Sequence, residues 1–199
     1  ADAGAAGKGG SSGEASVRLL KDREYVRDLI RAIDGAQEEI VVCMFLFKAS
    51  GYPGSYADRV VERLLKAARR GVRVEVVLER GGDPTGTLDR DNEATRRRLE
   101  EGGVRTRTDS PRRTTHTKLV VIDRRTTFVG SHNLTHSALK MNHEMSVVID
   151  SPAVAAETPY QAWDAVRAIA VEYDVLPAVV DAEEALAPGA PEVREGGNR

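Results

Sequence analysis

Apolar residues follow two alternating spacings along the chain, one typical of strands and one typical of helices. Consecutive or alternate apolar residues predict strands, whereas apolar residues three and four positions apart predict the buried face of a helix. We expect strands over 17–20, 40–47, 72–78, 118–122, 127–129 and 144–149, and helices over 26–35, 56–70, 92–101, 134–141 and 159–173. Strands that alternate with helices in this order predict an α/β fold, an α-β-α sandwich around a mixed, largely parallel sheet.

The two ends of the chain differ in composition from its centre. Residues 1–16 are mostly Gly, Ala and Ser and offer almost nothing to bury, so a flexible segment is expected there. Residues 175–199 are rich in Pro, Ala and Glu, which predicts an acidic, loosely ordered tail. The segment 17–174 between them is long enough for one domain with one hydrophobic core.

The overall composition is that of a soluble globular protein, with 41% apolar and 30% charged residues. The longest apolar run, 40–47, is far too short to cross a bilayer. Because the first residue is Ala1, we expect either a cytoplasmic protein or one exported after removal of a leader. Cys43 is the only cysteine and lies within that apolar run, which favours a small buried side chain over a disulfide or a metal ligand.

Positive charge is concentrated in the middle of a chain whose formal net charge is only −2. Residues 90–143 contain twelve Lys or Arg and six Asp or Glu, whereas residues 174–199 contain two and six. A basic centre next to an acidic tail predicts an anionic partner near residues 90–143. For Arg96, Arg97 and Arg98 a solvated helix face is the preferred interpretation.

The same central region contains one pattern of polar residues with a direct chemical use. It reads His116-Thr117-Lys118, four apolar residues, Asp123, six residues, and then Gly130-Ser131-His132-Asn133, and it occurs once. A strand directs residues i and i+2 to the same face, so His116 and Lys118 are expected side by side. The imidazole of such a pair can attack the phosphorus of a phosphodiester while the ammonium holds a non-bridging oxygen. Ser131 and Asn133 can add neutral donors to the same oxygens after a tight turn at Gly130.

Written as H-x-K-x4-D-x6-G-S-x-N, the pattern resembles the HKD motif of the phospholipase D superfamily at every typed position. A chain of this size with one such motif is most similar to the small bacterial endonucleases of that superfamily. The resemblance implies a phospholipase D-like catalytic domain over 17–174 that cleaves phosphodiesters through a phosphohistidine intermediate, without a metal or another cofactor. It also implies two motifs per active site. With one motif in the chain, a homodimer with a shared site is expected.

Further residues complete the expected site. Glu144 follows the motif and is expected to accept the Nδ1 proton of His116, the part that the superfamily gives to a glutamate at about this spacing. Asp123 is expected mainly to hold the turn between two strands, with a supporting electrostatic role in catalysis. The expected catalytic residues are therefore His116, Lys118, Ser131, Asn133, Glu144 and Asp123. The expected substrate-binding residues are Lys118, Ser131, Asn133, Arg112 and Arg113.

Two alternatives accompany these expectations. His132, His136 and His143 could form a zinc site, but the chain has no H-E-x-x-H pattern and no cysteine cluster. No metal is therefore expected, and these three histidines are expected at the surface or beside the site. The motif specifies the bond and not the molecule that carries it. An endonuclease acting on DNA or RNA is preferred, and the alternatives are a phospholipase D acting on phospholipid headgroups and a nucleic-acid-binding dimer without turnover.

Overall fold

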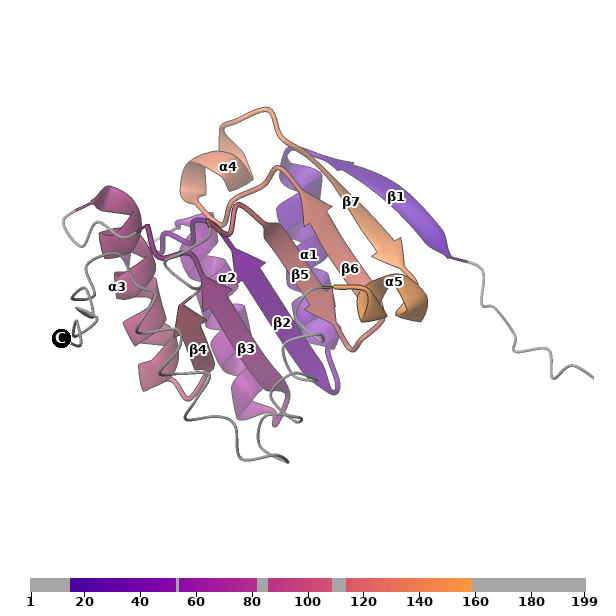
Figure 1. Ribbon diagram of the computed structural model, residues 1–199, viewed down its shortest axis with the longest axis horizontal. Helices are drawn as coiled ribbons and strands as arrows, with labels where there is room; N and C mark the ends of the chain where they lie inside the picture. Colours follow the sequence, from indigo (N-terminus) through magenta and orange to yellow (C-terminus); the bar gives the residue numbers. More distant parts are fainter. Residues whose placement is uncertain (1–14, 53, 82–85, 109–113, 159–199) are drawn as a thin grey trace, which may run out of the picture.

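One sheet of seven strands runs through the part of the protein that the computed structural model describes, residues 15–52, 54–81, 86–108 and 114–158 (Figure 1). The strands are β1 (Ser16–Lys21), β2 (Glu39–Met44), β3 (Arg73–Leu78), β4 (Arg105–Thr108), β5 (Lys118–Ile122), β6 (Thr126–Gly130) and β7 (Met145–Asp150). The helices are α1 (Arg23–Gly35), α2 (Tyr56–Arg69), α3 (Thr87–Glu101), α4 (His136–Lys140) and α5 (Pro152–Ala156). The strand order across the sheet is β1-β7-β6-β5-β2-β3-β4.

The sheet is mixed, which confirms the predicted α/β class. Strands β2, β3 and β4 are parallel to one another, but the other four neighbouring pairs are antiparallel. The prediction of a largely parallel sheet was wrong in this respect. Only residues 123–125 connect β5 to β6, and a connection that short permits an antiparallel hairpin but not the crossover that parallel strands need.

Helices α1, α2 and α3 cover one face of the sheet, and α5 lies on the other face (Figure 1). Strand β2 shows how the two faces arise from alternation along one strand. Ile40, Val42 and Met44 belong to the cluster packed against the first group of helices, whereas Val41 packs with Ala155 of α5. Within the described residues α5 is the one helix on that second face.

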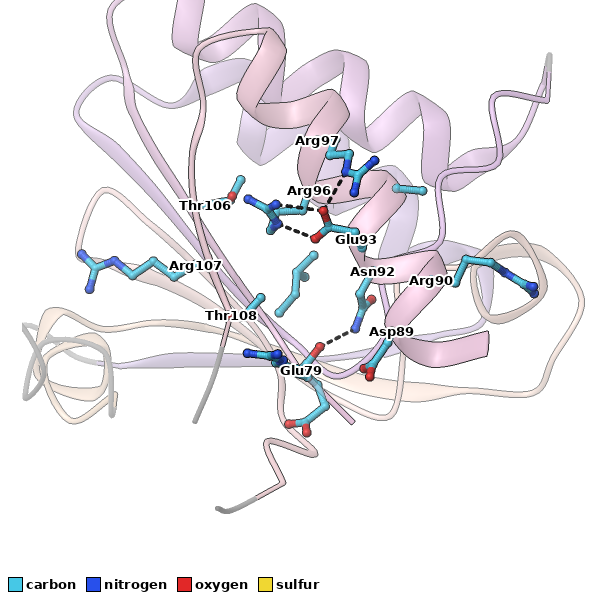
Figure 2. A pocket seen from close by; sticks show the side chains of 13 residues that line it. Glu79, Asp89, Arg90, Asn92, Glu93, Arg96, Arg97, Thr106, Arg107 and Thr108 are labelled. Carbon is cyan, nitrogen blue, oxygen red and sulfur yellow. Dashed lines mark hydrogen bonds and ion pairs between the residues drawn. The ribbon is translucent and has the colours of Figure 1, made fainter. Parts of the chain in front are cut away.

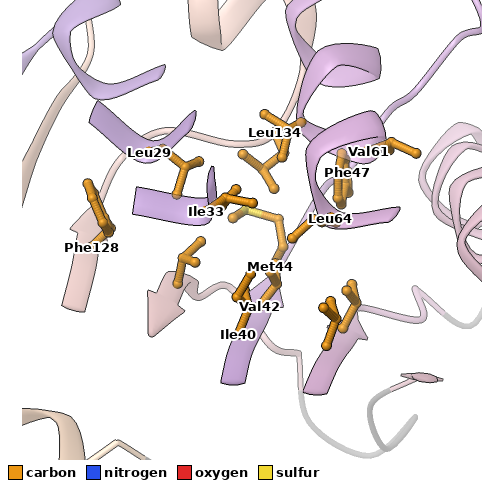
Figure 3. Packing of buried hydrophobic residues seen from close by; sticks show 14 of the residues in the cluster. Leu29, Ile33, Ile40, Val42, Met44, Phe47, Val61, Leu64, Phe128 and Leu134 are labelled. Atoms are coloured by element: carbon orange, nitrogen blue, oxygen red, sulfur yellow. The ribbon is translucent and has the colours of Figure 1, made fainter. Parts of the chain in front are cut away.

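The larger hydrophobic cluster fills the space between the sheet and the helices α1 and α2 (Figure 3). The apolar stripe expected for α1 is buried there, including Leu29 and Ile33, which are both fully enclosed. Burying one such side chain contributes about 1.5–3 kcal/mol to folding. Helix α2 begins after Ser55, whose hydroxyl caps the helix by accepting the Asp58 backbone N–H at 3.4 Å.

Several helices and strands begin or end at other residues than the sequence predicts, and two elements of the structure were not predicted. Helix α3 begins at Thr87, five residues before the predicted helix, and neither β4 nor α5 was expected. The predicted helix 159–173, the tail 175–199 and residues 1–14 lie outside the described residues. Ser16, placed in the flexible segment from sequence, is the first residue of β1.

The strand directions bring the motif residues together on the side of the sheet where strands begin or end, and not at one of its outer strands. Because β5 and β7 run opposite to the other strands, both begin at the edge where β1, β2, β3, β4 and β6 end. We call this side of the molecule the motif edge. The motif residues at or directly beside these strand ends are His116, Lys118, Ser131, Asn133 and Glu144.

Candidate active site

His116 and Lys118 lie side by side at the motif edge, where β5 begins. The exposed His116 ring has its centroid 4.6 Å from that of Phe45, with the two planes tilted by 58°. The Lys118 ammonium lies 4.9 Å from the same phenyl centroid and donates a 2.7 Å hydrogen bond to the His116 backbone oxygen. The ring of Phe45, the residue after β2, therefore contacts both His116 and Lys118.

Lys118 is the more enclosed member of this pair, with only 8% of the residue exposed. Burial lowers the pKa of the Lys118 ammonium, and the nearby Glu144 carboxylate opposes this by favouring the charged form. The cation is thus partly stripped of water and coupled to a carboxylate. A charge in such a place attracts a bound phosphate more strongly than a fully solvated charge would.

Ser131 and Glu144 form the next part of the site. The Ser131 hydroxyl donates to the Glu144 carboxylate and accepts the Met145 backbone N–H at 3.0 Å. Asn142 donates a 3.1 Å hydrogen bond to the other carboxylate oxygen of Glu144. In the described part of the chain no hydrogen bond joins Glu144 to His116, so the expected carboxylate–imidazole contact stays a prediction.

Asn133 is held between β6 and the end of β2. The next residue, Leu134, is fully buried, and its backbone pairs with Leu46 at 3.1 Å and with Lys48 at 3.0 Å. Strand β5 lies between β6 and β2, so this segment crosses the end of the sheet near the start of β5. The Asn133 Oδ1 atom is enclosed and has no hydrogen-bond partner among the described residues.

Gly130 permits the close approach of β6 and β7 beside this site. A Cβ atom at this position would lie 2.4 Å from the Ser146 Cα and 2.6 Å from the Met145 backbone oxygen. No side chain fits there without separating the two strands. The reason for glycine is therefore this close approach, and not the tight turn that the sequence suggested, since the positive-φ glycines of the described residues are Gly51, Gly54, Gly71 and Gly103.

Comparisons with known proteins establish the family of the chain. A family model described as "Cardiolipin synthase, PLD-like domain" matches residues 29–162, a span that contains every residue of the motif. The chain belongs to the phospholipase D superfamily. The family resemblance and the fold predicted from the motif are thereby confirmed.

Individual relatives of this phospholipase D-like domain differ in how much of their length it covers. The chain is 29% identical to Nuc from Salmonella typhimurium, a phospholipase D family member, and the two structures superpose with a TM-score of 0.62. The matched region is 76% of this chain and 93% of Nuc. The chain is 33% identical to cardiolipin synthase B of Shigella flexneri over 144 residues, which is 69% of this chain and 32% of that protein. It is 29% identical to the DISARM protein DrmC of Bacillus paralicheniformis over 140 residues, 68% of this chain and 52% of DrmC. The chain spans about a third of the cardiolipin synthases it matches.

Asp123 does not join the other motif residues of this phospholipase D-like domain. It lies beyond the far end of β5, and its carboxylate accepts the backbone N–H groups of residues 37–39 at 2.8–3.2 Å. Burial alone would raise the pKa of Asp123, but these three hydrogen bonds hold it below its usual value. The expected role in holding the turn fits this position, whereas a direct catalytic role does not, because a whole strand separates Asp123 from His116.

His132 is buried beside the site, which is the second of the two positions expected for this histidine. Its ring stacks on Tyr25 with centroids 4.3 Å apart and an interplanar angle of 6°. Its Nδ1 lies 2.7 Å from the Ser146 hydroxyl and its Nε2 lies 3.0 Å from the Asp22 backbone oxygen. The residue between Ser131 and Asn133 is therefore an anchor that fixes this segment to α1 and β7.

Asp22 was missed in the sequence and yet holds Glu144 through two hydrogen bonds. Its backbone N–H donates to the Glu144 oxygen at 3.0 Å, and its carboxylate accepts the Glu144 N–H at 3.0 Å. His143 lies 3.6 Å from the same carboxylate. Asp22 has a positive φ of 48°, a conformation that costs a non-glycine residue about 1–3 kcal/mol. An aspartate just before an amphipathic helix is typical of an N-cap, so the sequence signal pointed to a different role.

Arg112 and Arg113, expected to bind substrate, lie outside the described residues. The structure does describe a hollow of about 770 Å³ between α3 and β4, beside the motif edge (Figure 2). Many of its charges neutralise one another, since Arg96 and Arg97 both bind the Glu93 carboxylate. It meets the motif through Glu79, whose carboxylate accepts the Thr115 backbone N–H next to His116.

Two further properties concern the described residues alone. No group of three or more His, Cys, Asp or Glu side chains there is arranged so that it could hold a metal ion. None of the helices there combines the length and the apolar character that a membrane span requires.

Proposed function

We propose that this phospholipase D-like chain is a phosphodiesterase that works through a phosphohistidine intermediate without a metal ion, and that it is an endonuclease. The observation that carries the proposal is an exposed imidazole, His116, beside an enclosed ammonium, Lys118, at the motif edge. Exposure leaves the nucleophile within reach of a large diester, and burial of the cation strengthens its attraction for phosphate. We assign this activity to the domain 17–174.

The proposed reaction has two steps. Neutral His116 attacks the phosphorus, the P–O bond to the leaving group breaks, and the partner's His116 gives a proton to the leaving oxygen. Water then attacks the phosphohistidine and passes a proton to the partner's His116 while the P–N bond breaks, which restores both imidazoles. Lys118 and Asn133 hold the non-bridging oxygens in both steps, and Ser131 joins them when its hydroxyl proton turns from the Glu144 carboxylate to the phosphate.

The reaction needs two histidines at one phosphorus, and we propose that a second copy of the chain supplies the second. The other three histidines of the chain already have contacts elsewhere. His132 is buried against Tyr25, the Nδ1 of His136 accepts the Tyr56 backbone N–H at 3.3 Å, and His143 lies beside Asp22. A homodimer joined at the motif edge would bring two copies of His116 together about a twofold axis.

Nucleic acid is the substrate class that we favour. Nuc, of which this chain covers 93%, is a closer guide to the whole domain than cardiolipin synthase B, of which it covers 32%. We propose that Arg112 and Arg113, which come shortly before His116 in the sequence, contact phosphates on either side of the scissile one. Hydrolysis of a phospholipid headgroup is the second candidate, favoured by the 33% identity to cardiolipin synthase B.

The test is to incubate the protein in EDTA with plasmid DNA, single-stranded DNA, RNA and vesicles of phosphatidylcholine or phosphatidylglycerol. We expect cleavage of nucleic acid that EDTA does not inhibit and that His116→Ala reduces by at least about a thousandfold. Because His116 is exposed, the variant should unfold at the same temperature as the wild type. Turnover of lipid alone would replace the nuclease with a phospholipase, and tight binding without cleavage would support a nucleic-acid-binding dimer instead.

A further inference from the structure

A second hollow, of about 560 Å³, lies on the other flank of the motif edge. It is bounded by the end of β1, the first turns of α1 and the segment after α4. Four cationic side chains surround it: Lys21, Arg23, Arg27 and Lys140. We call these four residues and the space between them the basic hollow.

The cations of the basic hollow are not neutralised by the protein. Within the described residues Lys21, Arg27 and Lys140 have no side-chain ion pair or hydrogen bond. Arg23 donates through Nε to the Lys140 backbone oxygen at 3.3 Å, which holds the two sides of the hollow together but leaves its charge unpaired. This contrasts with the hollow between α3 and β4, where arginines and carboxylates bind each other.

Two carboxylates also line the basic hollow, and both are already in use. Asp22 accepts the Glu144 backbone N–H at 3.0 Å, and Glu24 accepts the Lys21 backbone N–H at 3.0 Å. Four cations against two carboxylates leave an excess of two positive charges. The start of α1 adds to this field, because its first backbone N–H groups point toward the same side and no side chain caps them.

The basic hollow shares a wall with the candidate active site. Asn142 lines the hollow and donates a hydrogen bond to the Glu144 carboxylate, which in turn binds Ser131. Asp22, which also lines the basic hollow, is a second connection to the candidate active site, because its backbone and its carboxylate both bind the Glu144 backbone. A chain of phosphates that enters the active site on this flank must therefore pass beside the four cations.

We propose that the basic hollow binds a backbone phosphate of a nucleic-acid strand next to the scissile phosphate. This inference rests on the proposed nuclease function. Unpaired arginine and lysine side chains around a concave surface suit a phosphate, which carries a full charge and several acceptor oxygens. A membrane surface would need an apolar docking patch, and the lining offers one strongly exposed apolar side chain, Met141 at 68%.

The test compares a large and a small substrate in one pair of matched double variants. Arg27→Gln with Lys140→Gln removes two cations of the basic hollow. Lys66→Gln with Arg69→Gln removes two exposed cations from the last turn of α2. That turn lies on the side of the sheet opposite to the motif edge, where β2 and β3 begin. The substrates are an oligonucleotide long enough to extend beyond the site and bis(4-nitrophenyl) phosphate, which reaches the reacting centre alone.

We expect the first double variant to raise KM for the oligonucleotide about tenfold and to reduce the slope of log KM against log salt by about 1–2. For the small diester its KM should rise less than about twofold, because that substrate has no neighbouring phosphate. The control variant should match the wild type on both substrates. The wild type and both double variants should have the same unfolding temperature.

Two other results would overturn the inference and separate it from the nuclease proposal. If the protein cleaves oligonucleotides and both double variants have the wild-type KM, the basic hollow is not a phosphate site while the nuclease stands. If the wild type hydrolyses the small diester and phospholipid vesicles but no nucleic acid, both proposals are wrong.

Discussion

At the scale of single residues, His132 has a defined protonation state that follows from its partners. The Asp22 backbone oxygen can only accept a hydrogen bond, so Nε2 of His132 must carry a proton. In the neutral ring Nδ1 then accepts from the Ser146 hydroxyl. Burial lowers the pKa of His132, which favours this neutral form. The ring thus orients the backbone on both sides of itself, at Ser131 and Asn133.

Replacing His132 with Phe should destabilise the protein and slow the reaction. The new ring can still stack on Tyr25, but the Asp22 oxygen and the Ser146 hydroxyl lose their partner, at a cost of about 2 kcal/mol in the free energy of unfolding. We expect kcat to fall about tenfold while KM changes less, because Ser131 and Asn133 are no longer fixed. Urea unfolding and steady-state kinetics on the same samples measure both effects.

His132→Gln is the matched comparison, since its amide N–H can replace the Nε2 donor. It should recover part of the stability and part of kcat relative to the Phe variant. Equal stability and kcat in the Phe variant and the wild type would show that the two hydrogen bonds do not position the segment.

His116 and Lys118 could be predicted as neighbours from sequence, because two residues two positions apart on a strand share a face. The burial of His132 could not be predicted in the same way. It depends on Tyr25, which is far away in the chain and lies beneath the motif only because α1 packs on this face of the sheet. The same holds for Asp22, whose contact with Glu144 joins two strands that are neighbours only in the folded sheet.

At the scale of elements, the hairpin of β5 and β6 is tied to the beginning of β2. Asp123 and Arg124 have φ values of 50° and 51°, as in the turns that match the twist of a two-stranded ribbon. The Asp123 carboxylate then accepts the N–H groups that precede and begin β2. One side chain therefore fixes the hairpin at the edge opposite to the motif edge.

Asp123→Ala should lower the free energy of unfolding by about 2–3 kcal/mol at pH 7, because three backbone N–H groups lose a charged acceptor. Since the pKa of Asp123 is lowered in the folded state, this contribution is present above the ordinary pKa of aspartate and is lost as pH falls through the lowered value. The difference between wild type and variant should therefore shrink below about pH 4. Urea unfolding at several pH values measures it, and a loss of kcat without a loss of stability would restore a catalytic role for Asp123.

The elements that the sequence could not predict share a physical reason. Strand β4 reads Arg-Thr-Arg-Thr and has no apolar face of its own, so its structure comes from pairing with β3. The direction of each strand likewise depends on the length of its connections and not on its own residues. The long apolar strands and α1 were predicted well because burial of their own side chains determines them.

At the scale of the whole molecule, a shared site predicts a particular response to mixing subunits. When wild-type and His116→Ala chains exchange in equal amounts, only pairs with two wild-type chains have both histidines. Activity per total protein should then fall to about a quarter of the wild-type value. A site complete within one chain would retain about half. Colorimetric assay of a mixing series, with subunit exchange confirmed by differently tagged chains, distinguishes the two curves.

The two outer strands of the sheet, β1 and β4, each have one pairing partner among the described residues and so present free backbone groups. Such edges invite strand addition between molecules, which leads to aggregation. Both strands carry cations, Arg18 and Lys21 on β1 and Arg105 and Arg107 on β4. Three of these cations are in ion pairs, Arg18 with Asp28 and both Arg105 and Arg107 with Glu75, so the charged side chains themselves, and not a net repulsion, disfavour the addition of another strand. Charged side chains on both outer strands thereby disfavour growth of the sheet into fibrils.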